Sequence, residues 1–300
     1  MTDPAKGVAA MLAACTIWGL SPLYYKLLVH VPPIEILAHR TLWSFVFFAV
    51  VLRMQGRIRI LFQSLVSRST GVWIVLAAFL ISFNWFVFIT SIQIEKAVEA
   101  ALGYYIFPLI SVLLGALVLG ERLGGRVQMA AVALAMGAVA ILTIGLGVAP
   151  WIALLISFSF GLYGLVKKRL FIGPVVSVTA EVLCLTPIAL VLLVGIHTGP
   201  DGGAFGATWP DTVLLAVSGP LTATPLILFS YAARRVSLAT LGLVQYLNPS
   251  LQFLVATLIF LEPFTGWHAV AFALIWTALA LYTASGWHQD RAARRAASRF

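Results

Sequence analysis

Charged residues are scarce in this chain. Only 10% of its 300 residues are charged, whereas charged residues make up about a quarter of ordinary globular domains. Hydrophobic residues account for 61%, and the mean hydropathy is +1.02. A water-soluble globular protein is therefore excluded, and a protein that crosses a membrane several times is indicated.

Catalytic and nucleotide-binding motifs are also missing. The sequence has no H-E-x-x-H, no G-x-S-x-G and no clustered carboxylate pair, so an intramembrane enzyme acting on a lipid-like substrate is only an alternative hypothesis. It has no G-x-x-x-x-G-K-[ST] motif, which predicts that the chain does not hydrolyse ATP. The two cysteines, Cys15 and Cys184, lie in apolar stretches and are expected to be core residues. We expect no cofactor and no metal.

Apolar stretches long enough to cross about 30 Å of hydrocarbon recur along the whole chain. The predicted fold class is therefore all-α and integral to the membrane, with ten transmembrane helices. The ten predicted spans are 7–28, 35–54, 71–92, 97–119, 126–144, 150–170, 175–196, 212–232, 237–261 and 266–286.

The net charge of +9 would suit a nucleic-acid partner, but the basic residues gather in alternate loops. The largest groups are Arg53, Arg57, Arg59 and Arg68, and Lys167, Lys168 and Arg169. Because basic loops stay in the cytoplasm, this pattern predicts that both termini are cytoplasmic. Residues 289–300 would form a basic cytoplasmic tail suited to anionic lipid, and we expect no nucleic-acid partner.

The chain repeats itself at an offset of 141 residues. LGYYIFPLISVLLGALVLGE (102–121) aligns with LVQYLNPSLQFLVATLIFLE (243–262), which brings Pro108 onto Pro249 and Glu121 onto Glu262. Earlier in each half, Gly19 corresponds to Gly161 when one residue is inserted.

Two halves of five spans follow from this repeat, 1–145 and 146–288. Five is odd, so the second half starts on the opposite side of the membrane from the first. The prediction is therefore two inverted five-helix repeats, an architecture of many secondary transporters, with a substrate cavity at their interface.

Several stretches also carry a family resemblance. WGLSPLYYKLL, EILAHRTLWS, FGLYGLVKK, GPLTATPLILFSYAARR, LGLVQYLNPSLQF and AFALIWTALALY resemble the RarD-type permeases in the EamA branch of the drug/metabolite transporter superfamily. The similarity covers nearly the whole chain. It implies a ten-helix, inverted-repeat permease of the bacterial cytoplasmic (inner) membrane, and it implies no particular substrate.

Three amides form one stripe in the ninth span. Gln245, Asn248 and Gln252 are spaced by three and four residues, so they share one face of a helix that lipid cannot satisfy. We expect this face to line the cavity, although amides that only bind neighbouring helices are the alternative. Pro108 and Pro249 would bend two paired helices. Through the repeat, Tyr104 and Tyr105 are expected in the opposite wall.

Charged groups within spans are functional candidates because they are costly there. Arg40 and Lys26 are predicted near the same depth, where they would recruit a carboxylate or phosphate. The alternatives are that Lys26 reaches the interface and that Arg40 forms an ion pair. Trp18, Asn84 and Trp85 complete the predicted substrate-binding set. Glu181 and Lys168 are further candidates. We expect them to form an ion pair, and the alternative is that Glu181 couples transport to protons.

The leading hypothesis is a secondary transporter. It would be a permease that exports a small organic metabolite or drug, such as an amino acid or a chloramphenicol-like compound, by alternating access at a central cavity. A passive channel is a further alternative. The expected partners are this small-molecule solute and membrane lipids. The sequence leaves open the substrate, the direction, proton coupling and whether the chain forms a homodimer.

Overall fold

The computed structural model describes residues 3–120, 126–200, 202–236 and 238–297, and this part of the chain holds helices and no strands. The helices are α1 (Asp3–Leu27), α2 (Pro33–Met54), α3 (Ile58–Val66), α4 (Arg68–Gln93), α5 (Ala97–Leu119), α6 (Arg126–Leu146), α7 (Trp151–Lys167), α8 (Pro174–Thr198), α9 (Trp209–Ala233), α10 (Leu238–Gln245), α11 (Leu247–Leu254), the π-helix η1 (Val255–Ile259) and α12 (Gly266–Ala297). The all-α prediction is confirmed for these residues.

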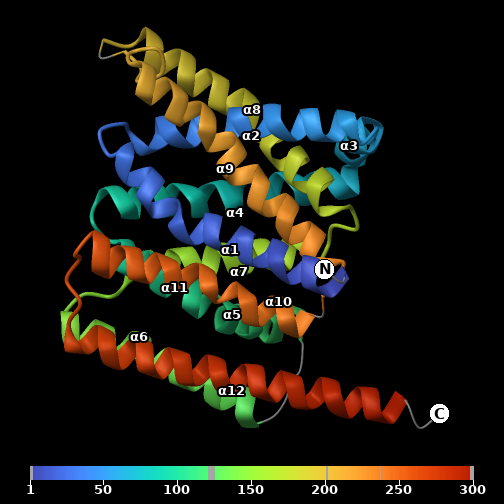
Figure 1. Cartoon of the computed structure of the whole chain (residues 1–300), viewed down its shortest axis with the longest axis vertical. Helices are drawn as coiled ribbons and strands as arrows, with labels where there is room; N and C mark the ends of the chain where they lie inside the picture. The colour runs from blue at the N-terminus through green and yellow to red at the C-terminus, as the bar shows by residue number, and fades with distance from the viewer. Residues whose placement is uncertain (1–2, 121–125, 201, 237, 298–300) are drawn as a thin grey trace.

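Seven of the described helices are long and apolar enough to cross a membrane, namely α1, α2, α4, α5, α6, α8 and α9. Three shorter apolar segments add to them, at Trp151–Lys167, Leu243–Ile259 and Gly266–Leu281. These segments fall at the ten predicted spans. The long axes run roughly across Figure 1, which places α3 and the end of α12 on one side and the turn between α1 and α2 on the other. We call these the termini side and the far side.

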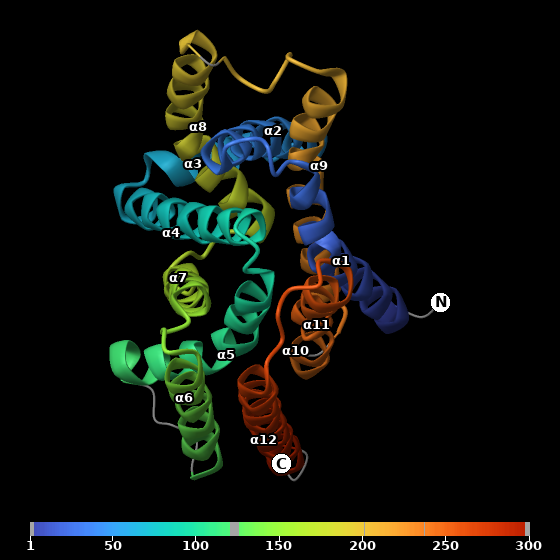
Figure 2. The same cartoon turned by 90° about the vertical axis from the view of Figure 1, so that its left-hand side faces the viewer.

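The ninth span is interrupted, and its repeat partner is not. α10 ends at Gln245 and α11 begins at Leu247, because Pro249 has no N–H to donate to the carbonyl one turn earlier. α5 instead continues helically through Pro108, although Figure 2 shows that it changes direction along its length. Pro249 therefore accompanies a helix break, whereas Pro108 lies in a helix that changes direction without a break.

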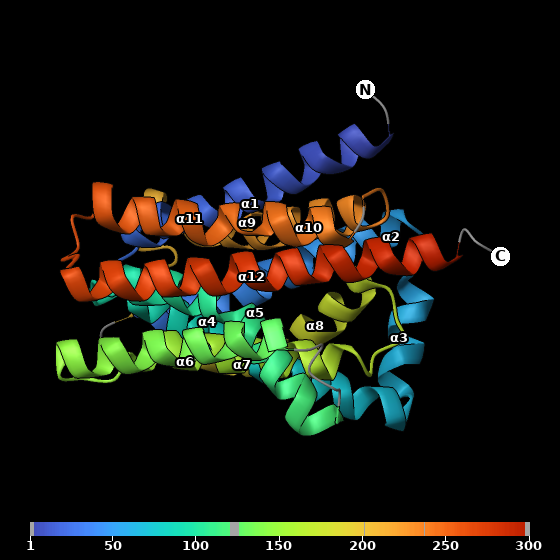
Figure 3. The ribbon, with the colours of Figure 1, turned by 90° about the horizontal axis from the view of Figure 1, so that it is seen from below.

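Helices from the two halves pack against each other. α1 contacts α9 and α11, and α7 contacts α4 and α5, while α2 packs on α8 and α9. α6 and α12 lie side by side, as Figures 2 and 3 show. In Figure 2, α1, α9, α10 and α11 form one column, and α4, α7 and α6 form another.

Two glycines at related positions of the repeat make close helix contacts possible. A Cβ on Gly19 would lie 2.6 Å from Leu251 Cβ and 3.1 Å from the Asn248 carbonyl oxygen, so α1 and α11 approach through Gly19. A Cβ on Gly161 would lie 3.0 Å from Leu114 and 3.3 Å from Ile110, so α7 meets α5 in the same way. Close backbone approach through small residues is typical of membrane helix packing.

Two predicted non-helical segments contain helix. The loop between the second and third spans contains α3, whose Leu61 packs under Ile74 in a small apolar cluster. The predicted tail at 289–300 continues α12 as far as Ala297, because alanine and arginine favour helix. Residues 298–300 lie outside the described residues, as does Glu121 of the repeat alignment.

Glu262 caps the start of α5 from a distant part of the chain. Its Oε1 accepts a hydrogen bond from Ala97 N at 2.8 Å, and its Oε2 accepts one from Val98 N at 2.8 Å. Both N–H groups are among those that a helix start leaves unpaired. Burial raises the pKa of the Glu262 carboxyl above its usual value, and the two N–H groups oppose that shift.

We predict that Glu262→Gln lowers the thermal unfolding midpoint of the detergent-solubilised protein by the equivalent of about 1–3 kcal/mol, because one buried N–H then faces an amide donor. The control is Glu95→Gln. The Glu95 side chain is 76% exposed and pairs only loosely with Lys26, at 3.4 Å. Equal midpoints for Glu262→Gln and the parent would show that the carboxylate does not stabilise α5.

Candidate functional site

A cavity of about 1410 Å³ lies between the two columns of helices. Nearly all of the predicted site residues border it: Trp18, Arg40, Asn84, Trp85, Tyr104, Tyr105, Pro108, Lys168, Gln245, Asn248, Pro249 and Gln252. They come from seven helices or their ends, which sequence separation alone does not bring together. Lys26 and Glu181 are not part of the lining.

Arg40 supplies a buried positive charge to this cavity. Only 6% of the residue is exposed, and its Nη1 donates a 2.7 Å hydrogen bond to Tyr25 Oη. The guanidinium carbon stands 4.1 Å from the ring centroid of Trp85, which is a cation–π contact. Nε has no hydrogen-bond partner, and within the described residues no carboxylate forms an ion pair with Arg40. The predicted alternative of a helix-packing ion pair is therefore not what these residues show.

The amide stripe faces the cavity from the interrupted ninth span. Gln252 Nε2 donates to Asn248 Oδ1 at 2.9 Å, so these two amides hold each other in place. Gln252 Oε1 is buried and has no partner among the described atoms. Gln245 ends α10, where the backbone is already interrupted. The stripe thus combines one unused acceptor with a break in the helix, a combination suited to a polar ligand.

Polar contacts position the opposite wall. Asn84 Nδ2 donates to Ile156 O and to Ser159 Oγ, both at 2.9 Å, and Asn84 Oδ1 accepts a 3.0 Å bond from Tyr104 Oη. These bonds join α4, α5 and α7, so Asn84 holds three helices together and also borders the cavity. Tyr105 Oη lies 2.7 Å from Ser250 Oγ and connects α5 to α11.

Aromatic rings of α1, α4 and α5 pack in series beside the cavity, near the far-side ends of these helices. Ring centroids are separated by 5.0 Å between Tyr24 and Tyr25, 5.9 Å between Tyr25 and Phe88, and 5.8 Å between Phe88 and Tyr104, in edge-to-face pairs. Tyr25 and Phe88 are both buried. In the other direction the lining continues to Lys168, just past the end of α7. The cavity therefore extends toward the termini side.

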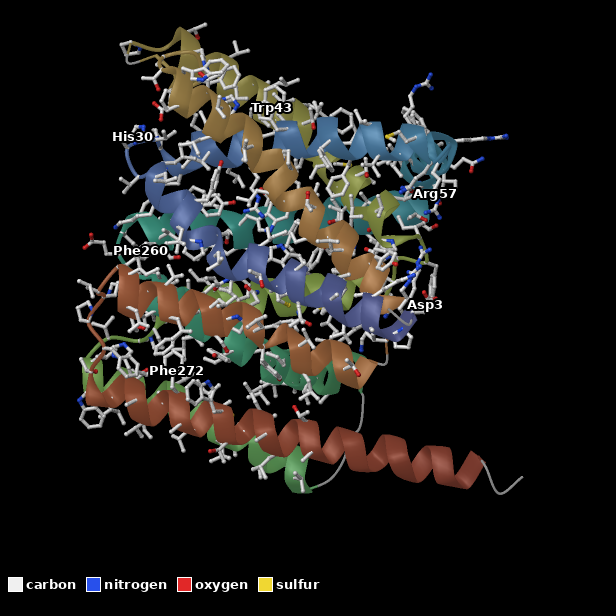
Figure 4. All side chains as sticks on the ribbon, viewed as in Figure 1. Asp3, His30, Trp43, Arg57, Phe260 and Phe272 are labelled. Carbon is white, nitrogen blue, oxygen red and sulfur yellow. The ribbon has the colours of Figure 1, made fainter. Side chains whose placement is uncertain are left out.

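Lys26 lies apart from Arg40, which corrects the prediction that both would serve one site. Its Nζ is 3.4 Å from Glu95 Oε1 at the far-side end of α1 and stands 5.4 Å from the ring centroid of Phe260. A third of its side chain is exposed. Figure 4 labels Phe260 at this edge of the molecule. The long side chain has reached out to the interface, as lysines near helix ends do.

Glu181 pairs with Lys167 rather than with the predicted Lys168. Lys167 Nζ donates to Glu181 Oε1 at 2.6 Å, and Tyr163 Oη donates to Oε2 at 3.0 Å. Lys167 also contacts Ser177 Oγ, which donates to Glu181 Oε1 at 2.8 Å. Consecutive residues on a helix point about 100° apart, so only one of the two lysines can face α8. Both lysines border the cavity.

Some cavity residues were not predicted. Ser250 is the partner of Tyr105, and Trp276 of α12 packs on the same ring at 6.2 Å. Ser250 follows Pro249 directly, so the interrupted helix was the available signal. No repeat or spacing in the sequence indicated Trp276.

Comparisons with known proteins now decide the family. The EamA-like transporter family model matches residues 5–144. The uncharacterized transporter YojE of Bacillus subtilis is 43% identical over 296 residues, covering 97% of this chain and 98% of its own. Protein RarD of Streptomyces exfoliatus is 43% identical over 298 residues, covering 98% and 92%. The chain belongs to the EamA-like transporter family. Its RarD-named relatives make it a RarD-type permease.

A solved crystal structure resembles the permease at a TM-score of 0.59 and 20% identity, covering 92% of this chain and 96% of that chain. At that identity the likeness shows the fold alone. YojE is named as a transporter, which agrees with the several apolar helices of a multi-pass membrane protein.

We predict that cysteines placed singly at Gln245 and Asn248 of the permease react with a charged, water-soluble thiol reagent, because these positions border the cavity. The background lacks Cys15 and Cys184. The control is Leu258→Cys in the same span, where a 68% exposed side chain faces lipid and stays unreactive. Labelling is measured by mass shift. If Gln245→Cys and Asn248→Cys labelled as slowly as Leu258→Cys, the stripe would not face water.

Proposed function

We propose that this permease is a secondary transporter that exports a small amphipathic organic solute with a carboxylate group, such as an amino acid, by alternating access. The observation that carries the proposal is Arg40, a buried guanidinium that borders the cavity without a carboxylate partner among the described residues. A buried cation is stable when an opposite charge compensates it, and a substrate carboxylate would supply that charge. Bidentate pairing with a carboxylate suits the guanidinium fork.

The remaining lining supports both ends of such a solute. Trp85 and Tyr104 offer apolar ring surface near the guanidinium, while Gln252 Oε1 offers an acceptor across the cavity. An ammonium or amide group of the solute would donate to this acceptor. A chloramphenicol-like compound would use the same rings and amides but would leave Arg40 without a counter-charge.

The packing supports two inverted five-helix repeats, with the halves at 1–145 and 146–288. The repeat relates α1 to α7, α4 to α9 and α5 to α11. The α4–α7 contact therefore corresponds to the α9–α1 contact, and the α5–α7 contact corresponds to the α11–α1 contact. All four contacts are present. Gly161 against Ile110 becomes Gly19 against Leu251 in the same way. Related contacts of this kind provide two similar arrangements of the same helices, which alternating access requires.

In the proposed transport cycle, the aromatic rings of α1, α4 and α5 close the far side. With both termini in the cytoplasm, the cavity that extends toward Lys168 faces inward and would receive solute from the cytoplasm. Opening toward the periplasm requires the edge-to-face pair of Tyr25 and Phe88 to separate. Because Tyr25 Oη also accepts a hydrogen bond from Arg40, a solute carboxylate that takes over this donor would loosen the aromatic closure.

We predict that Arg40→Gln weakens solute binding or transport at least tenfold for carboxylate solutes while leaving neutral solutes unaffected. A lost charge-assisted contact in a water-poor site is worth about 1.5–3 kcal/mol, which is about tenfold or more. Export is measured from proteoliposomes loaded with amino acids, organic acids and chloramphenicol. The control is Arg53→Gln, on the same helix but exposed. Transport of carboxylates by folded Arg40→Gln at the parental rate would refute the role of Arg40.

We also predict that a reporter active only outside the cytoplasm stays silent when fused after Phe300, and gives signal when inserted at the α8–α9 loop near Gly206. An even number of crossings places the two ends of the chain on one side, and the basic loops place that side in the cytoplasm. The reverse pattern would refute the proposed orientation and with it the direction of the cycle.

A further inference from the structure

A second polar cluster lies at the far side, apart from the cavity lining. Glu35 and His39 stand one turn apart at the start of α2, and His197 lies on the last turn of α8. One side-chain ligand atom from each residue lies within 4.8 Å of the other two. No metal was expected from the sequence. The fold brings His39 and His197 together beside Glu35.

His39 is the anomaly in this cluster. It is 3% exposed, and neither Nδ1 nor Nε2 has a hydrogen-bond partner among the described atoms. Its ring stacks on Phe205 with centroids 4.8 Å apart, which leaves the nitrogen edges free. Trp43, labelled in Figure 4, lies one turn further along α2 and also contacts Phe205, with ring centroids 6.0 Å apart. An imidazole buried with both nitrogens unused is costly unless something binds it.

Glu35 adds a buried negative charge. It is 1% exposed, and its Oε1 accepts hydrogen bonds from Ala204 N at 2.7 Å and Phe205 N at 3.4 Å. The same oxygen lies 4.0 Å from His39 Nε2. No lysine or arginine forms an ion pair with Glu35 in the described part of the chain. A compensating cation is what this carboxylate lacks.

His197 supplies the third group. Its Nδ1 is 2.8 Å from Leu193 O, and its Nε2 is 3.1 Å from Phe205 O. A neutral imidazole has one N–H, so one of these nitrogens turns a lone pair toward a carbonyl oxygen. A ligating histidine usually donates its other N–H to a backbone carbonyl, which the contact with Leu193 provides. Gly203 leaves room for the ring, because a Cβ there would lie 2.4 Å from it.

We propose that Glu35, His39 and His197 bind a divalent transition-metal ion of the zinc type. Two imidazoles and a carboxylate are the donors of such ions, whereas magnesium and calcium prefer oxygen alone. With bonds of about 2.0–2.1 Å, neighbouring ligands around tetrahedral zinc stand about 3.4 Å apart, so side-chain shifts of about 1 Å close the site. His197 is exposed, which leaves a position for water.

The bound ion would join α2 to α8 at the far side. His39 precedes Arg40 on α2, so an ion that fixes this end of α2 also fixes the backbone that carries the cavity guanidinium. The site itself does not depend on which solute is transported.

The test uses the full-length protein in detergent, with any affinity tag removed. Zn²⁺ binding is measured by isothermal titration calorimetry, and Co²⁺ binding by the visible absorption of tetrahedral cobalt. We expect one ion per chain, a higher thermal unfolding midpoint with Zn²⁺, and no competition from excess Mg²⁺. His197→Gln and Glu35→Gln should each weaken Zn²⁺ binding at least tenfold.

The matched control is His30→Ala, an exposed histidine on the same side that contacts Asp211 Oδ1 at 2.9 Å and is labelled in Figure 4. It should bind Zn²⁺ as the parent does. His197→Gln tests the site even if variants of the buried His39 fail to fold. Parental affinity in His197→Gln, loss of binding in His30→Ala instead, or no saturable Zn²⁺ binding by the parent would each overturn the proposal.

Discussion

Hydrocarbon offers no hydrogen bonds, and the arrangement of this molecule follows from that constraint. Backbone groups are satisfied within long helices, and the described helices break within the membrane at Tyr246, beside the cavity. Polar side chains within the helices also form hydrogen bonds to other parts of the protein. Asn84 meets two oxygens of α7, and Glu181 meets Lys167 and Tyr163. Arg40 Nε, Ser111 Oγ and Gln252 Oε1, by contrast, are buried polar atoms of cavity-lining residues that have no hydrogen-bond partner among the described atoms.

Much of the fold could be predicted because its signals are local or repeated. Hydropathy placed the spans, and the spacing of Gln245, Asn248 and Gln252 identified one helical face without any knowledge of neighbours. The repeat, with one residue inserted, tied Gly19 to Gly161, and both glycines do make close helix contacts. The spacing of residues along one helix determines which side chains share a face, whatever the helix packs against.

The features that were missed depend on how each helix is rotated about its axis and on how deep each side chain lies in the membrane. The sequence specifies neither. Lys167 and Lys168 are neighbours in the chain, and a turn of about 100° decides which one meets Glu181. Lys26 and Arg40 were expected at one depth, yet the end of α1 carries Lys26 out to Glu95. Pro108 and Pro249 are equivalent by repeat, but only the second accompanies a helix break. Glu35 and His39 show helical spacing, but His197 joins them only through the packing of α2 on α8.

The helix contacts also determine when the molecule can become stable during synthesis. α1 is synthesised before the other described helices, but its partners α9 and α11 come late in the described part of the chain. α7 leads the second half and rests on α4 and α5 of the first. Each packing column in Figure 2 therefore contains helices from both halves of the chain. A first half released alone would leave the surface around Gly19 without α11, which packs on it. The two halves are therefore stable only when they are packed together.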